Sequence, residues 1–561
     1  MNSRRRWVWL LIALLVVPGC AALPRSGQVE AGLKEVPGLQ PYVQAVAAPP
    51  APDASLDQIV EGFLQAMLAG ATDDFAVART YLAEDIAAVW DPTASVTVYQ
   101  SGEAPQVSQH GSQLGRVVLS VTQVGTVDAS GRYAAQPPEV KTATLQLSQD
   151  QDSQWRISSL PDGTVIPEDV FQGDYVAVPI YFPSPDAQYL VPDRRMFPRK
   201  AAATAAVKQF LAGPPPYLTG AVGAVVPVGT RLSTDAVQVA GSVATVNFSN
   251  AMSRASESAR ATVLACLNAT LTQLPEIHSV ELQVDAAPLS VPPSSGLKVD
   301  PSAAGGPFYL GDGGVWRYES GSVRVLAGTD AASSWESLAV DHTMKRLAGL
   351  EQGQLRVLVG EDAAQAFTWN LPAPATAVPH FDRVGWLWVA SGDVITAFSA
   401  EGEPKALGAT WLQGQVVTAL AASRDAARLA LAIHNPEDGS SRMVVSGIVR
   451  ADGAAPWRLT GPLELGPVPG SVTSLNWADA YTLAFLAAPS SGAAPAPTTL
   501  VVGGNLEHLK SPTDPPVFLA SGRGPDQIYV TGKAGGLFSY AVRGRVWTAL
   551  GSGARAVTLA P

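Results

Sequence analysis

The chain has 561 residues, of which 47% are hydrophobic and 15% charged, and its formal net charge is −11. This length predicts several domains of roughly 100–200 residues, each large enough to build its own core. The acidic balance argues against nucleic acid as a partner, because phosphate binding depends on clustered Lys and Arg. Beyond the N-terminus no apolar run approaches the roughly 20 residues of a membrane span, which excludes a multi-span membrane protein.

The N-terminus carries the parts of an export signal. Three arginines at positions 4–6 precede an apolar stretch over residues 7–17, which is too short for a stable membrane span. The segment that follows resembles a bacterial lipobox and consists of Val17, Pro18, Gly19 and Cys20. The resemblance implies that residues 1–19 are a removed signal peptide and that Cys20 carries acyl chains, palmitate among them. The alternative is that Cys20 is an incidental apolar residue at the end of the stretch.

Lipidation of Cys20 predicts a protein held on the extracytoplasmic face of the cell membrane, because acyl chains contribute ~0.8 kcal/mol per buried methylene. We therefore expect residues 20–54 to form a lipidated N-terminus and a Pro-rich tether. With Cys20 committed to lipid, Cys266 has no partner for a disulfide within the chain. We expect Cys266 to be a buried thiol in an apolar helix.

Residues 55–170 predict an α+β domain. Ser55 and Gln58 have the spacing of a capping box, and the apolar stripe that follows predicts a helix ending near Gly70. A short helix over 74–81 precedes strand-like segments at 95–99, 116–124, 140–147 and 154–157. Helices before a meander of strands favour a cystatin-like or NTF2-like fold. Such folds often hold a pocket, but this segment offers only His110 and scattered carboxylates, so we favour a structural or protein-contact role.

Residues 174–290 predict the order β-α-β-α-β. The strands are expected at 178–183, 244–249 and 280–285, and the helices over 201–212 and 256–274. Six blocks resemble the spore-germination-type GerMN domain: Ile180-Tyr181-Phe182, Leu190-Val191-Pro192, Phe210-Leu211-Ala212-Gly213-Pro214, Pro227-Val228-Gly229-Thr230, Val246-Asn247-Phe248-Ser249 and Thr270-Leu271-Thr272 with Val280 and Val284-Asp285. That family is not known as catalytic, so the resemblance implies a non-enzymatic domain.

Residues 300–561 predict an all-β domain built from a repeat. Leu338-Ala339-Val340-Asp341 and Leu420-Ala421-Ala422-Ser423 stand 82 residues apart, and each is followed at the same offset by Arg-Leu-Ala. Midway between them lies a related segment, Pro379-His380-Phe381-Asp382. Half of this spacing matches the roughly 40–50 residues of a four-stranded propeller blade. The count predicts a β-propeller of about six blades, with a pair of β-sandwiches as the alternative.

The order of these parts resembles the actinobacterial lipoprotein LpqB family. The blocks that carry the resemblance are the lipobox with residues 20–27, Trp155-Arg156-Ile157 through Gly163, and Gly385-Trp386-Leu387-Trp388. The resemblance implies an exported accessory protein that contacts the extracytoplasmic domain of an MtrB-type sensor histidine kinase. It also implies an influence on a two-component system that governs the cell envelope and division.

The sequence contains no HExxH, GxSxG, CxxC or Walker motif. We therefore expect no enzyme, no catalytic residue, no cofactor and no metal site. The best candidates for a polar channel rim or an interface in the propeller are Asp341, His342, His380, Asp382, Trp386 and Trp388. Turn-forming Asp, exposed His and core Trp are the commoner alternative for residues of these types. An exposed tryptophan of the propeller would be a candidate interface hot spot.

Three functional hypotheses follow, in this order. The first is a lipid-anchored regulator that binds a membrane sensor kinase. The second is a module that binds cell-wall glycan or peptide, through the propeller channel or the first domain. The third is a propeller hydrolase that uses Asp341 and Asp382, although a pair of carboxylates with the required separation cannot be established from the sequence.

Overall fold

The computed structural model describes residues 47–561 except 110–114, 294–295, 320, 361–362, 364, 452–453, 490–491, 525–526 and 542–543. The predicted signal peptide, the lipobox with Cys20, most of the tether and His110 lie outside the described residues. Residues 45–561 form one compact unit.

The first helix begins where the sequence predicts it. The Ser55 hydroxyl accepts a hydrogen bond from the Gln58 amide at 3.4 Å, and the Gln58 side chain accepts one from the Ser55 amide at 2.9 Å. This complete capping box satisfies two amides that the first helical turn leaves without partners. The helices of this domain are α2 (Leu56–Asp73), α3 (Ala76–Arg79) and α4 (Glu84–Val89).

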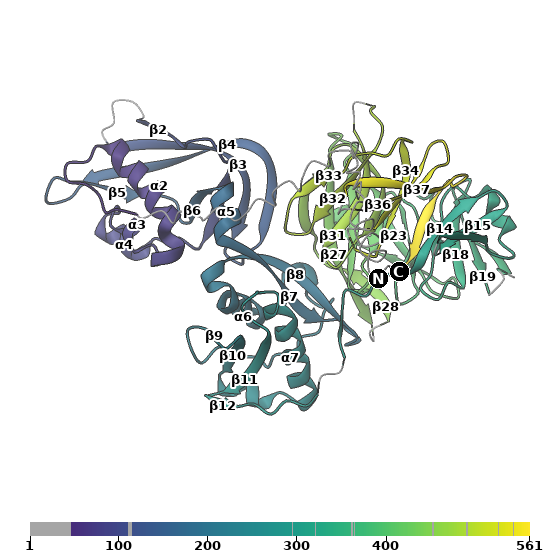
Figure 1. Ribbon diagram of the computed structural model, residues 1–561, viewed down its shortest axis with the longest axis horizontal. Coiled ribbons are helices and arrows are strands. Elements are labelled where there is room, and N and C mark those ends of the chain that lie inside the picture. The colour runs from purple at the N-terminus through teal and green to yellow at the C-terminus, as the bar shows by residue number, and fades with distance from the viewer. Residues whose placement is uncertain are drawn as a thin grey trace, which may run out of the picture. The chain divides into compact units, whose positions relative to one another are not determined.

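A six-stranded sheet completes the N-terminal domain. Its strands are β1 (Ser95–Tyr99), β2 (Gln106–Gln109), β3 (Arg116–Asp128), β4 (Tyr133–Gln149), β5 (Trp155–Ser159) and β6 (Thr164–Pro167). The order is β5-β4-β3-β1-β6, with β2 on the edge of β3, and the long β3 and β4 strands curve beside α2 (Figure 1). Phe63 of α2 shares a hydrophobic core with Leu119, Leu145 and Ile157 of the sheet. The predicted α+β fold, with helices on one sheet face, is confirmed.

The second domain contains two sheets. The first is β13-β8-β7 and the second is β12-β11-β10-β9, in which β10 and β11 are parallel. The strands are β7 (Tyr175–Pro183), β8 (Tyr189–Pro198), β9 (Gln238–Ala240), β10 (Val243–Phe248), β11 (Ser279–Val284), β12 (Ala287–Pro288) and β13 (Lys298–Val299). The helices are α5 (Glu168–Asp174), η1 (Arg199–Ala201), α6 (Ala202–Ala212), η2 (Pro216–Leu218), η3 (Asn250–Arg254) and α7 (Glu257–Leu271).

The first predicted strand of this domain, β7, is followed by a second strand, β8, before the first helix of the predicted β-α-β-α-β order. β7 forms an antiparallel hairpin with β8 because the chain reverses directly after Pro183. The Ser184 amide donates to the Tyr189 carbonyl at 2.8 Å, and the Tyr189 amide donates to the Ser184 hydroxyl at 3.0 Å. Cys266 is fully buried in α7, as the sequence predicts.

The described residues from 304 to 560 form six sheets, five with four strands and one with five, which confirms a propeller of about six blades. The first blade contains β14 (Ala304–Gly311), β15 (Gly314–Glu319), β16 (Ser322–Val325) and β38 (Val557–Ala560). The second contains β17 (Ala339–Val340), β18 (Arg346–Glu351), β19 (Gln354–Val359) and β20 (Gln365–Trp369). The third contains β21 (His380–Phe381), β22 (Leu387–Ser391), β23 (Val394–Phe398) and β24 (Pro404–Leu407).

The fourth blade has the additional strand and contains β25 (Val416–Ala422), β26 (Arg428–His434), β27 (Ser441–Ala451), β28 (Ala455–Leu459) and β29 (Leu463–Pro467). The fifth contains β30 (Ser471–Trp477), β31 (Thr482–Ala488), β32 (Ala496–Val501) and β33 (Leu506–His508). The sixth contains β34 (Pro516–Ser521), β35 (Ile528–Gly532), β36 (Leu537–Ala541) and β37 (Val546–Gly551).

The last strand closes the ring of blades. β38 pairs with β14, where Thr558 lies opposite Phe308 and Val557 opposite Tyr309. In Figure 1 the yellow end of the chain therefore lies beside the teal strands of the first blade. Joining the two ends of the domain in one sheet removes two free sheet edges and ties the first blade to the last segment.

The second domain and the propeller share one hydrophobic cluster. The Thr460 hydroxyl donates to the Tyr217 carbonyl at 2.6 Å. A Cβ at Gly447 would lie 2.5 Å from the same Tyr217 oxygen, so this approach requires glycine.

Within the propeller, the Arg428 guanidinium of the fourth blade lies 4.5 Å from the ring centre of Trp477 in the fifth blade, within the distance of a cation–π contact.

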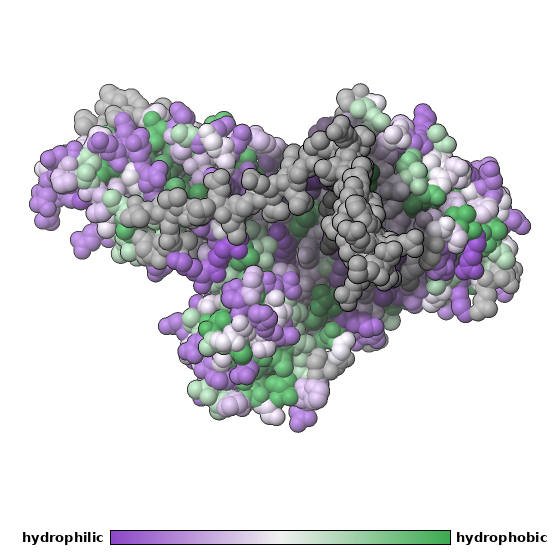
Figure 2. All heavy atoms as spheres, in the orientation of Figure 1, coloured by the Kyte–Doolittle hydropathy of each residue, from purple (hydrophilic) through white to green (hydrophobic). Residues whose placement is uncertain are grey.

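No helix in the described part of the chain is long and apolar enough to cross a membrane. On the face shown in Figure 2, hydrophobic and hydrophilic residues are interspersed, as on ordinary water-exposed protein surfaces.

Candidate functional site

Two of the predicted channel residues, Asp341 and Asp382, hold equivalent turns in neighbouring blades. Asp341 Oδ1 accepts hydrogen bonds from the backbone amides of Lys345 at 2.9 Å and Arg346 at 3.0 Å. Asp382 Oδ1 accepts one from the Trp386 amide at 2.9 Å. Each carboxylate therefore closes the turn between the first and second strands of its blade, a role that suits Asp because its short side chain reaches nearby amides.

Asp341, Asp382 and Trp388 are buried, which fits the alternative of turn-forming Asp and core Trp better than a rim or an interface. Trp388 Nε1 donates to Asp382 Oδ2 at 2.8 Å, and the Asp382 side chain has no exposed surface. The aspartates satisfy buried backbone amides, and Trp388 packs in the core between blades. His342 is exposed and Trp386 is half-buried, so an interface role for these two stays a prediction.

His380 lines a small cavity formed by the inner strands of several blades. Other lining residues are Ala422 of β25, Asn476 of β30 and Ser521 of β34. His380 Nδ1 is buried and has no hydrogen-bond partner among the described residues. Burial lowers the pKa of His380 to about 4, although the nearby Asp382 carboxylate acts in the opposite direction. The ring is therefore neutral at pH 7.

Trp457 on β28 is the most exposed of the large hydrophobic side chains in the described part of the propeller, at 62%. Lys405 Nζ of β24, in the preceding blade, lies 5.1 Å from the Trp457 ring centre. Lys405 and Trp457 therefore form a patch that is aromatic and basic. The sequence contains many tryptophans in this domain, and nothing in their spacing separates Trp457 from those in the core.

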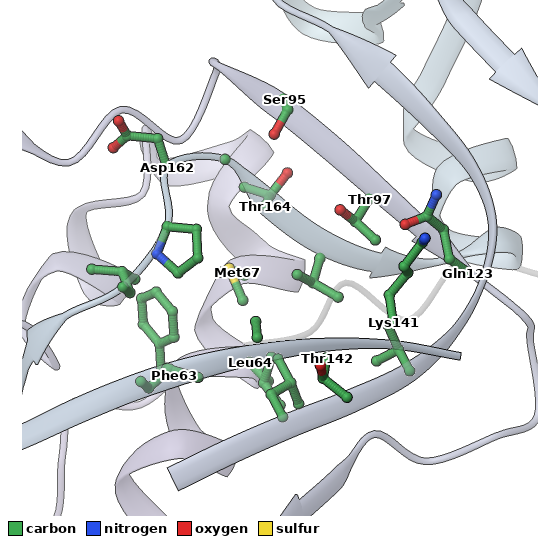
Figure 3. Close-up of a pocket in the computed structure, with 18 residues that line it drawn as sticks. Phe63, Leu64, Met67, Ser95, Thr97, Gln123, Lys141, Thr142, Asp162 and Thr164 are labelled. Carbon is green, nitrogen blue, oxygen red and sulfur yellow. The ribbon is translucent and has the colours of Figure 1, made fainter. Parts of the chain in front are cut away.

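A cavity of about 290 Å³ lies between α2 and the sheet of the N-terminal domain (Figure 3). Its apolar lining includes Phe63, Leu64, Met67, Leu119, Val121 and Leu145, and its polar lining includes Ser95, Thr97, Gln123, Lys141, Thr142, Asp162 and Thr164. The sequence did not identify this pocket because its lining comes from α2, β1, β3, β4, β6 and the segment before β6. These segments meet only in the folded domain.

The polarity of the cavity lining changes along strands β3 and β4. Alternate residues on a strand share a face, so Gln123, Val121 and Leu119 follow one another along β3. On β4, Lys141 lies opposite Val121 and Ala143 lies opposite Leu119. The lining therefore changes from polar at Gln123 and Lys141 to apolar at Leu119. In Figure 3 the side chains of Gln123 and Lys141 lie together at one end of the pocket, with Phe63 and Leu64 toward the other.

One polar atom in the cavity lining is unsatisfied. Thr164 is only 3% exposed, and its hydroxyl has no hydrogen-bond partner among the described residues. Gly163 precedes it with a φ of +99°, and a Cβ there would collide with the Ser95 hydroxyl and backbone, so the approach of β6 to β1 requires glycine. At the polar end, Lys141 Nζ lies 2.9 Å from Glu139 in a largely exposed ion pair.

The described residues hold no group of three or more His, Cys, Asp or Glu side chains that could bind a metal ion.

Comparisons with known proteins cover all three domains. Residues 49–172 match the model "Lipoprotein LpqB, N-terminal domain", residues 179–290 match "Sporulation and spore germination", and residues 313–558 match "Lipoprotein LpqB beta-propeller domain". Among solved structures, the nidogen/laminin complex is 14% identical with a TM-score of 0.35, covering 46% of this chain and 98% of that one.

Several curated relatives share the name lipoprotein LpqB. The protein from Cutibacterium acnes is 34% identical over 52% of this chain and 48% of its own length. The protein from Streptomyces coelicolor is 33% identical over 48% of this chain and 47% of its own length, so these two alignments span about half of each relative. The protein from Thermobifida fusca is 26% identical over 85% of this chain and 86% of its own length. With its N-terminal and propeller domains both matched, the chain belongs to the lipoprotein LpqB family.

Proposed function

We propose that this protein is anchored to the extracytoplasmic face of the cell membrane through Cys20 and binds the extracytoplasmic domain of an MtrB-type sensor histidine kinase. Through that contact it would regulate a two-component system that controls the cell envelope and division. Membership in a family named for lipoproteins supports the anchor. The observation that carries the binding role is the exposed Trp457 beside Lys405.

The patch of Lys405 and Trp457 has the chemistry of a protein-binding hot spot. Tryptophan is enriched among residues that dominate binding energy. A ring exposed to 62% costs apolar hydration in the free protein, and a partner that covers it recovers that cost. The Lys405 cation favours a partner that presents a carboxylate beside an apolar centre.

The test is the affinity of residues 45–561 for the purified extracytoplasmic domain of the kinase from the same organism. We expect Trp457→Ala to weaken binding by at least about 30-fold, which corresponds to the ~2 kcal/mol of a hot spot. Phe367→Ala is the matched control, because Phe367 is a 44% exposed aromatic residue on the outer strand of another blade. Equal affinities for the parent and Trp457→Ala would remove this patch from the proposal.

The alternative role, binding of cell-wall glycan or peptide, predicts a different result in a parallel assay. Retention of the protein on purified wall polymer, lost in Trp457→Ala and kept in Phe367→Ala, would favour the alternative. Failure of the kinase domain to bind any of the three proteins, together with failure to crosslink to the kinase in membranes, would reject the regulator proposal.

A further inference from the structure

We infer that the cavity between α2 and the N-terminal sheet binds a single-chain amphiphile, an acyl chain that ends in an anionic head group. This ligand site is separate from the Trp457 patch and does not depend on the proposed kinase contact. Two features of the cavity carry the inference: its graded polarity and its size.

The apolar end of the cavity fits a hydrocarbon tail. Leu119 and Leu145 come from the sheet, and Phe63, Leu64 and Met67 come from the facing side of α2. Apolar side chains therefore line this end from both layers. Transfer of a hydrocarbon chain from water into such surroundings is favourable in proportion to the apolar area that is buried.

The polar end fits an anionic head group. Lys141 supplies a positive charge two residues from the apolar position Ala143, and beside it lies Gln123, whose amide nitrogen donates to the Gln136 side chain. The carboxylate of Asp162 belongs to the lining on the other side of the cavity, away from Lys141 (Figure 3). The partner of Lys141, Glu139, is itself largely exposed, and such surface ion pairs contribute little stability. A ligand carboxylate or phosphate can therefore replace Glu139 at the Lys141 ammonium group at low cost.

The size of the cavity restricts the ligand to one chain. Its volume of about 290 Å³ is at the lower limit of small-molecule pockets, which run to about 1,000 Å³. A single acyl chain with a compact head matches this space, and a two-chain phospholipid does not.

The experiment measures binding of decanoate, decyl phosphate, decanol and decyltrimethylammonium to residues 45–561 by calorimetry, below the micelle concentration of each compound. The four compounds share one chain and differ in the head group. We expect both anions to bind, decanol to bind at least tenfold more weakly, and decyltrimethylammonium to bind more weakly still. A preference between decanoate and decyl phosphate distinguishes a fatty-acid source from a phospholipid-derived source.

Matched variants test each end of the cavity. Lys141→Met should weaken decanoate binding at least tenfold, whereas Glu139→Gln should strengthen it because the competing carboxylate is removed. Lys208→Met, at an exposed position on α6, is the charge control and should leave binding unchanged. Ala143→Phe should abolish binding of every compound by filling the apolar end, and its folding is checked by thermal unfolding.

Equal binding of decanoate and decyltrimethylammonium would overturn the inference. So would decanoate binding that is unchanged in Lys141→Met and in a folded Ala143→Phe.

Discussion

Asp382 and Arg450 lie 68 residues apart in the chain and form a buried ion pair, with 2.6 Å between Asp382 Oδ2 and Arg450 Nη2. Asp382 also holds the turn after β21, and Arg450 belongs to β27 of the next blade. The remaining guanidinium nitrogens of Arg450 donate to the Ala426 and Ala454 carbonyls at 3.0 and 2.7 Å. The pair therefore joins two blades with its charges compensated and its donors satisfied.

We expect Asp382→Asn to lower the free energy of unfolding by about 3–5 kcal/mol, because it leaves the Arg450 charge buried without a counterion. Urea unfolding of residues 45–561 measures the change. Glu319→Gln is the control, since the pair of Glu319 with Arg317 is partly exposed and its loss should cost about 1 kcal/mol or less. A loss in Asp382→Asn no larger than in this control would contradict the prediction.

Cys20→Ser tests the anchor. Because acyl chains contribute ~0.8 kcal/mol per buried methylene, their loss should release the protein from the membrane fraction. Ser26→Ala changes a neighbouring polar residue of the same segment and should leave the protein in the membrane fraction. Cell fractionation followed by immunoblotting measures the distribution. If Cys20→Ser protein stayed in the membrane fraction after a salt wash, another feature of the chain would hold it there.

Cys266 should be inert in the folded protein. Its side chain is fully buried in α7, and desolvation raises the pKa of its thiol far above the usual range, so almost no thiolate forms at pH 7–8. We expect maleimide to leave the folded residues 45–561 unmodified and to label one thiol after denaturation, as read by mass spectrometry. Rapid labelling under native conditions would mean that α7 opens on the timescale of the reaction.

Local signals in the sequence predicted individual elements well. Ser55 and Gln58 predict the start of α2 because a capping box acts within one helical turn. The spacing between Leu338 and Leu420 predicts the blades because each blade repeats the same burial pattern. The β7–β8 hairpin was not predicted, since its reversal depends on the Ser184 side chain, which the period of the apolar residues does not report.

The candidate sites depended on contacts between distant residues and were largely invisible in the sequence. The repeat places Asp341 and Asp382 at the ends of related segments, but the burial of Asp382 depends on Arg450 in another blade. The exposure of Trp457 follows from its place on an outer strand, and a Trp has the same apolar character in either environment. The lining of the N-terminal cavity comes from α2 and from four strands that are distant in the sequence.

His380 gives the propeller a predicted sensitivity to acid. Its pKa is about 4 in the folded protein and about 6.5 in an unfolded chain, so the unfolded chain binds the proton more readily. The stabilisation from keeping the ring neutral is fully present above about pH 6.5 and is lost progressively as the pH falls towards 4. Between pH 7 and pH 5 this single group should lower the free energy of unfolding by about 2 kcal/mol.

The matched variant for this prediction is His380→Gln, which carries no titratable group at the position. Urea unfolding at pH 7 and pH 5 gives the loss of stability for each protein, and the difference between the two losses isolates His380 from the carboxylates that also titrate. We expect the parent to lose about 2 kcal/mol more than His380→Gln over this range. Equal losses would show that the ring is solvated well enough to accept a proton in the folded propeller, and that Asp382 compensates the charge.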